Sequence, residues 1–125
     1  MLTERDSGKG VLFNRLGDCL VILVPDELGS ATFESIRAGF CQAQAQAPIR
    51  GIILDCSGLE VMDLEDYGAI QKIRKIFGLL GAKTVILGLK PGVVAALVAL
   101  GCEGESLTGA LELEQALEMI RLGGR

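Results

Sequence analysis

The segment from Gly51 to Gly81 constrains the fold more than any other stretch of the chain. It opens with a continuous apolar run at residues 52–54, which is typical of a strand covered on both faces. Ser57 and Gly58 then predict a turn. Beyond the turn, apolar residues return at helical spacing: Ile70, Ile73, Phe77 and Leu80. The segment predicts a buried strand, a turn and an amphipathic helix for which Gly81 is the C-cap.

The connection between this strand and helix carries both apolar and acidic residues. We expect Leu59, Val61 and Met62 to turn their side chains back under the sheet. Asp63 is a favourable N-cap, and Asp66 stands three residues later at the capping-box position. We therefore expect the function to lie between Ser57 and Tyr67.

The rest of the chain alternates strands and helices. Strands are predicted at 11–13, 18–24 and 84–89, with a hairpin turn at 15–18 and a loop or weak edge strand at 103–109. A first helix is predicted from Gly29–Ser30 to Pro48, capped by Ser30 or Thr32. A second is predicted at 91–100, and an exposed side on it would indicate a homotypic contact. A third is predicted at 111–122, with Leu113, Leu117 and Ile120 on one side. The order predicts an α/β fold with a mostly parallel sheet of four to five strands, an antiparallel first strand and about four helices.

Composition excludes several classes of function. The chain has 125 residues, a net charge of −4, no tryptophan and one tyrosine, so we expect no nucleic-acid binding. Histidine is absent, which removes Ser-His and Cys-His nucleophile pairs and the common zinc sites. We expect a single domain at residues 11–122, between a flexible tail at 1–10 and a short tail at 123–125.

The four cysteines indicate a reducing compartment. They form no CxxC pair; Cys19 and Cys56 lie in apolar segments, while Cys41 and Cys102 have no basic neighbours and are expected to be inert. The polar first ten residues lack the apolar region of a signal peptide, and no apolar run is long enough to span a membrane. We therefore predict a cytoplasmic protein with no membrane association.

Residues 54–101 resemble the STAS domains of bacterial anti-sigma factor antagonists, in particular the single-domain proteins of stressosome scaffolds. They read LDCSGLEVMDLEDYGAIQKIRKIFGLLGAKTVILGLKPGVVAALVALG. The signs are a strand followed by DxSGLxxxD and a helix, then GAKTVILGLKP, then an apolar helix that ends in LG. The earlier run RLGDCLVILVP is also similar to the start of those proteins. The similarity extends over about residues 11 to 122, and it implies the STAS fold.

The resemblance also implies where such a protein works. In that family a Ser or Thr normally follows an Asp at the start of this helix, and a partner serine kinase phosphorylates it to switch partner binding. A phosphate would add charge and acceptors at a helix N-terminus. Here the Asp is Asp63 but the next residue is Leu64, so the usual position cannot be phosphorylated. A second regulatory Thr of some scaffold members is matched by Ala95 and Ala96.

We expect a non-catalytic interaction module that needs no cofactor or metal. The resemblance implies a serine-kinase anti-sigma factor, paralogous STAS scaffold proteins or a second copy of the chain as partners. The predicted partner-binding residues are Ser57, Gly58, Asp63, Leu64, Glu65, Asp66 and Tyr67. Their carboxylates serve either as simple capping groups or as an imitation of a phosphorylated face. Leu64 can also act as an apolar anchor.

Three other interpretations remain open at this point. Ser57 could accept phosphate in place of residue 64, although such a serine more often bonds its own turn. Asp55, Asp63, Glu65 and Asp66 could be imagined as a magnesium site, but the acidic pair and lysine of such sites lack counterparts. The turn at Lys90–Gly92 precedes a helix and could bind a small nucleotide or another anion, but no phosphate-loop motif accompanies it.

Overall fold

The computed structural model describes residues 2–3, 11–26, 28–101 and 109–123. In these residues six strands form one sheet in the order β1–β2–β3–β4–β5–β6. The strands are β1 (Leu2–Thr3), β2 (Leu12–Leu16), β3 (Cys19–Leu23), β4 (Gly51–Asp55), β5 (Lys83–Leu87) and β6 (Gly109–Ala110). The β1–β2 and β2–β3 pairs are antiparallel, whereas β3 to β6 run parallel. This sheet and four helices confirm the predicted fold class. The two-residue β1 was not predicted, and the two-residue β6 lies at the end of the expected loop or weak edge strand at 103–109.

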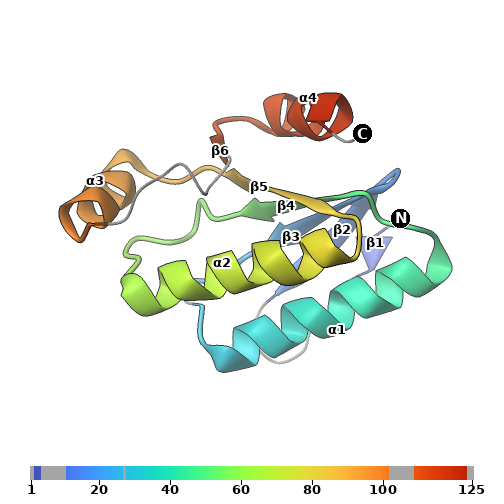
Figure 1. Cartoon of the computed structure of the whole chain (residues 1–125), viewed down its shortest axis with the longest axis horizontal. Coiled ribbons are helices and arrows are strands. Elements are labelled where there is room, and N and C mark those ends of the chain that lie inside the picture. Colours follow the sequence, from blue (N-terminus) through green and yellow to red (C-terminus); the bar gives the residue numbers. More distant parts are fainter. Residues whose placement is uncertain (1, 4–10, 27, 102–108, 124–125) are drawn as a thin grey trace.

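The helices cover the sheet unequally. On one face lie α1 (Ser30–Gln46) and α2 (Leu64–Leu79), and α4 (Leu113–Gly123) lies on the other (Figure 1). The short α3 (Pro91–Ala99) stands beyond one end of the sheet, the same end at which α2 begins (Figure 1). The molecule is thus a three-layer α/β domain that is thicker on the side of α1 and α2.

Strand register sorts the apolar side chains into two cores. Ile22, Leu54 and Ile86 are aligned across neighbouring strands and belong to the core under α1 and α2. The alternate residues Ile53 and Val85 face α4 and pack with its buried side chains. Since successive side chains of a strand point to opposite faces, the central strands have to be apolar throughout. This explains the continuous apolar runs in the sequence.

Two helix features were predicted incorrectly. Leu80, expected on the buried face of α2, is 53% exposed, because the helix ends at Leu79 and the helical spacing no longer applies at the next residue. The N-cap of α1 is Gly29, and its first turn has no side-chain cap, so neither Ser30 nor Thr32 has that role. Gly81, predicted as the C-cap of α2, follows the observed C-cap Leu80 and has a φ of +90°, the left-handed conformation in which glycine commonly ends a helix.

The remaining predictions differ mainly at element ends. The hairpin strands begin and end within one to three residues of the predicted ranges, and Leu113 is exposed whereas Ile120 is buried. Cys19 and Cys56 are buried as predicted, and Cys41 is exposed. Cys102 and residues 103–108 of the expected loop or edge strand lie outside the described residues. So do residue 1, residues 4–10 and residues 124–125 of the expected tails.

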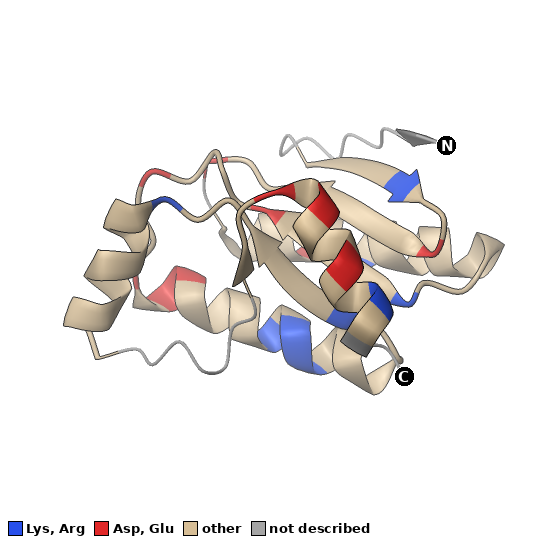
Figure 2. Cartoon of the chain, turned by 90° about the horizontal axis from the view of Figure 1, so that it is seen from above, with Lys and Arg blue, Asp and Glu red and all other residues tan. Residues whose placement is uncertain are grey.

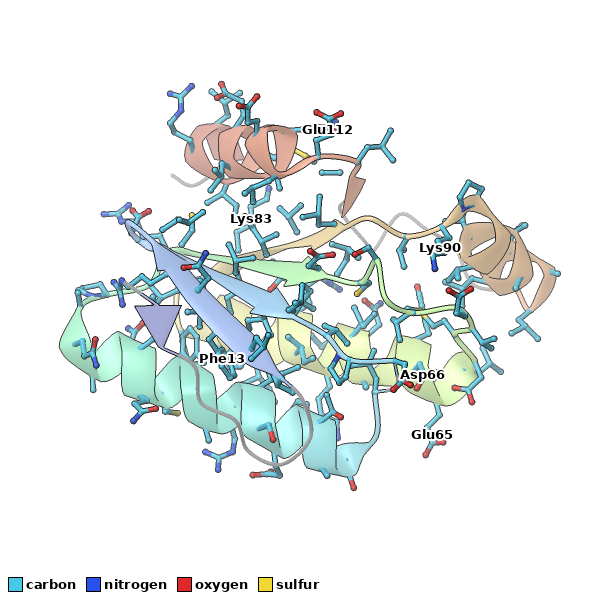
Figure 3. The ribbon with its side chains drawn as sticks, turned by 180° about the vertical axis from the view of Figure 1, so that it is seen from behind. Phe13, Glu65, Asp66, Lys83, Lys90 and Glu112 are labelled. Carbon is cyan, nitrogen blue, oxygen red and sulfur yellow. The ribbon has the colours of Figure 1, made fainter. Side chains whose placement is uncertain are left out.

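The contact between α1 and β2 generates a stability prediction. Phe13 points from β2 towards α1 (Figure 3), and a methyl group on Gly39 would overlap its ring. Gly39→Ala should therefore lower the free energy of unfolding by about 1–3 kcal/mol through overpacking. Gly68→Ala is the control, since no atom lies within 4 Å of its added methyl group, and it should raise stability by about 0.5–1 kcal/mol. Urea unfolding of both variants tests this; equal stability of the two would contradict the packing.

Candidate functional site

The connection between β4 and α2 starts with a turn held by Asp55. Its Oδ1 accepts hydrogen bonds from the backbone N–H of Ser57 at 3.1 Å and from the Ser57 hydroxyl at 2.8 Å. The Leu59 N–H then donates to the Cys56 carbonyl at 3.0 Å. This is the local side-chain-to-backbone bonding that serine and aspartate commonly make in turns. The exposed Ser57 hydroxyl thus has a structural partner in its own turn.

Two buried side chains fix the path of the connection. Leu59 and Met62 are almost completely buried in the core under α1 and α2, as predicted. Val61 was expected beside them but is 72% exposed. The segment has no regular secondary structure here, so neighbouring side chains need not follow any repeat, and Val61 points out between two anchors. The buried side chains of Leu59 and Met62, on either side of the exposed Val61, therefore fix the position of the first turn of α2.

The start of α2 is closed by the predicted capping box. Asp63 Oδ1 accepts from the backbone N–H of Asp66 at 2.8 Å, and Asp66 Oδ2 accepts from the backbone N–H of Asp63 at 3.2 Å. Two of the otherwise unpaired N–H groups at the helix start are thereby bonded. Burial of its side chain raises the pKa of Asp66 above its ordinary value of 3.8, and the neighbouring charges of Asp63 and Glu65 act in the same direction.

The predicted partner-binding residues fall into two groups. Ser57 and Gly58 lie beside the ends of neighbouring strands. A Cβ atom added to Gly88 would lie 3.1 Å from the Ser57 Cβ, and one added to Gly58 would lie 3.5 Å from the Val24 carbonyl oxygen. The other five form the N-cap and first turn of α2: Asp63, Leu64, Glu65, Asp66 and Tyr67. We call these five residues the α2 start. Asp63, Leu64 and Glu65 are exposed, whereas Asp66 and Tyr67 are half-buried.

Leu64 is the apolar centre of the α2 start. Its side chain is 54% exposed although it begins a helix that packs on the core. Figure 3 shows Glu65 and Asp66 projecting from the same turn, and Figure 2 shows that acidic residues gather there while basic residues occupy later turns of α2. The arrangement combines an exposed aliphatic group with surrounding carboxylates, which suits contact with an apolar surface that carries positive charge.

A groove that was not predicted continues from the α2 start. It has a volume of about 420 Å³ and lies between the start of α1 and the first half of α2. Its lining residues are Leu28, Gly29, Ser30, Phe33, Glu65, Gly68, Ala69 and Lys72. The Lys72 ammonium lies 5.1 Å from the centre of the Phe33 ring, within reach of a cation–π interaction. The small residues Gly68 and Ala69 leave this space open. Their presence in the first half of α2 is the one feature of the sequence that could have indicated the groove.

Lys90 does not offer a free cation at the start of α3. Its ammonium lies 2.5 Å from Glu60 Oε2, and Figure 3 shows Lys90 where the chain enters α3. This pair joins the β4–α2 connection to α3 across 30 residues of sequence. Lys90 is the N-cap residue of α3 and makes no side-chain cap bond. Glu60 is therefore a further residue of this end of the molecule that sequence analysis missed.

The described part of the chain contains no group of three or more His, Cys, Asp or Glu side chains arranged to hold a metal ion. No helix within the described ranges has the length and apolar character needed to cross a bilayer.

Comparisons with known proteins agree on one family. The STAS domain family model matches residues 11–117. No curated protein sequence matches the chain. Among solved structures, a Ser-to-Glu variant of RsbS from Moorella thermoacetica superposes with a TM-score of 0.72 at 23% identity, over 90% of this chain and 96% of that one.

Two further structures show the same fold. A chain from the stressosome, described as a signal integration and transduction hub, has a TM-score of 0.72 at 23% identity, over 90% of this chain and 98% of that one. The anti-sigma factor antagonist SpoIIAA in its unphosphorylated form has a TM-score of 0.62 at 25% identity, over 90% of this chain and 96% of that one. The chain thus spans nearly the full length of these proteins.

The capping box generates a pH prediction. Because the pKa of Asp66 is raised in the folded state, its contribution to stability is present in full below the unfolded pKa and is lost as pH rises through the folded pKa. Asp66→Asn keeps an oxygen that can accept the Asp63 N–H but removes the titration. Wild type should therefore lose stability relative to Asp66→Asn as the pH rises from below 3.8 through the raised pKa of Asp66. Chemical unfolding at several pH values measures this difference, and a difference that grows in favour of wild type as pH rises would show the sign to be wrong.

Proposed function

Because this chain belongs to the STAS domain family, we propose that it is a non-catalytic protein-interaction module of a partner-switching or stressosome-type regulatory system. It shares its fold with RsbS, with a chain of the stressosome and with the anti-sigma factor antagonist SpoIIAA. The partners are a serine-kinase anti-sigma factor, paralogous STAS scaffold proteins or both, and a second copy of the chain can dock in the same way. Such partners place the protein in the cytoplasm.

The observation that carries this proposal is the rigid, outward-facing α2 start. The capping box fixes its backbone, Leu59 and Met62 anchor the chain just before it, and Leu64 remains 54% exposed at its centre. An exposed apolar side chain within a charged rim fits the apolar centre and polar rim of a protein–protein interface. The groove beside Phe33 and Lys72 extends the same surface towards α1.

The switch differs from that of the family that the chain resembles. Leu64 replaces the hydroxyl residue that would receive phosphate, and the nearby Ser57 hydroxyl is bonded to Asp55. Three carboxylates already surround this position, at Asp63, Glu65 and Asp66. The chain therefore binds its partner constitutively, and the kinase activity of a partner does not release it.

The alternative of a nucleotide or anion site at Lys90–Gly92 stays a prediction without a supporting observation, because Lys90 is paired with Glu60.

The phosphorylation part of the proposal has a direct test. Wild type, incubated with ATP and each serine-kinase anti-sigma factor of its source organism, should acquire no phosphate on residues 57–67, because residue 64 has no hydroxyl. Leu64→Ser should acquire stoichiometric phosphate, and the antagonist native to each kinase serves as the positive control. Mass spectrometry of the intact protein and its peptides gives the answer; stoichiometric phosphate on Ser57 of wild type would refute the proposal.

The docking role of Leu64 is tested by a matched pair of substitutions. Leu64→Ala should weaken binding to the purified partner by about tenfold or more, because an interface centre loses its apolar contact. Leu79→Ala removes an even more exposed leucine, 87% exposed at the other end of the same helix, and should leave affinity unchanged. Titration calorimetry measures both affinities, and circular dichroism checks the fold. Equal losses in the two variants would place the interface elsewhere.

A further inference from the structure

The face of the sheet that carries α4 is only partly covered. α4 lies over β4, β5 and β6, and the outer side chains of the β2–β3 hairpin extend beyond it. Leu12 and Leu23 are opposite each other in the antiparallel register, and they are 44% and 41% exposed. Val21, on the same face by alternation, is half-buried. The hairpin therefore presents an apolar strip beside α4.

A pocket lies at the other end of this strip. It has a volume of about 350 Å³ and is enclosed by the hairpin turn, the residue before β4 and the last turns of α4. Its apolar walls are Leu16, Leu117 and Ile120. Cys19 completes them with a neutral thiol, because burial and the charge of Asp18 raise its pKa to about 11. The size and the apolar lining are those of a small-molecule site.

The rim of the pocket carries two arginines. Two arginines, Arg50 and Arg121, and one aspartate, Asp18, line it, and each arginine is paired with one carboxylate. Arg50 Nε lies 3.6 Å from Asp18 Oδ2, and Arg121 Nη2 lies 2.5 Å from Glu118 Oε2. A guanidinium has five N–H donors, so each arginine keeps donors for a second acceptor.

We propose that this pocket binds the carboxylate of a medium-chain aliphatic acid. Arg50 and Arg121 hold the carboxylate, and the chain follows the strip past Val21 towards Leu12 and Leu23. From Cys19 to Leu23 the strand spans about 13 Å, a length that an extended medium-chain tail can follow. One amphiphilic ligand thus accounts for both the arginines at the rim and the exposed apolar strip.

This site is independent of the proposed function. Asp18, Cys19 and Arg50 lie at the N-terminal ends of the parallel strands, while Asp55 and Ser57 lie at the C-terminal ends. In Figure 1 the C-terminal end of α4 lies at the opposite end of the sheet from the α2 start. A failure of ligand binding would therefore leave the partner-binding proposal intact, and the reverse also holds.

The experiment is a titration of the full chain with sodium octanoate, followed by amide chemical shifts. Saturable shifts are expected at residues 16–21, 50–51 and 117–121. Acetate lacks the chain and octan-1-ol lacks the charge, so each should bind at least about tenfold more weakly. Affinity should rise roughly fourfold for each methylene from butanoate to octanoate.

Matched arginine variants decide whether the charged rim is responsible. Arg121→Gln should weaken octanoate binding by about tenfold or more, and Arg50→Gln provides a second variant should the first be unstable. Arg37→Gln is the control. Arg37 pairs with a glutamate three residues away, Glu34, as Arg121 pairs with Glu118, but Arg37 lies on α1 and not at the pocket. It should bind like wild type. The proposal is overturned by an absence of saturable shifts at these residues, by equal affinity for octan-1-ol, by unchanged affinity in Arg121→Gln and Arg50→Gln, or by a dimer that buries the strip and excludes octanoate.

Discussion

The parallel pairing of β3, β4 and β5 is the constraint on which the rest of the molecule depends. Each of these strands contributes apolar side chains to both faces, so two cores form on a single sheet. Parallel strands also bring their carboxyl ends to one edge, which places the connection after β4 beside the ends of β3 and β5. Of the described helices on the α1–α2 side, only α2 has acidic residues in its first turn, and the start of α2 is thereby placed at that edge.

The α2 start is exposed because its neighbours are buried. Leu59 and Met62 take up the available core positions, and Tyr67 packs partly against the same core. Between them the capping box determines where the helix begins, so Leu64 has no inward position left to occupy. An interaction surface built in this way needs little rearrangement on binding, which lowers the entropic cost of association. Under the proposed function, Leu64 in place of a phosphorylatable side chain turns a switch position into a fixed contact.

Local patterns predicted part of this site, whereas contacts between distant segments could not be predicted from them. The capping box depends on two residues three positions apart, so the sequence identified it. Val61 lies in an irregular segment without a repeat, and its exposure depends on how the turn packs. The Lys90–Glu60 pair joins residues 30 positions apart. Arg15 likewise donates to the carbonyls of Ala43, Ala47 and Pro48 at the end of α1. These residues are also far apart in the sequence, so no local motif predicts the contact.

The central claim is that partners dock on the exposed, unmodified α2 start. Amide hydrogen exchange of the wild-type chain, measured alone and in complex with its purified partner, tests it most directly. The account predicts that protection on binding rises at residues 63–68 and along the groove at 29–33, without any phosphate on the protein. Protection confined to α3 or α4, with the exchange of residues 63–68 unchanged, would contradict it.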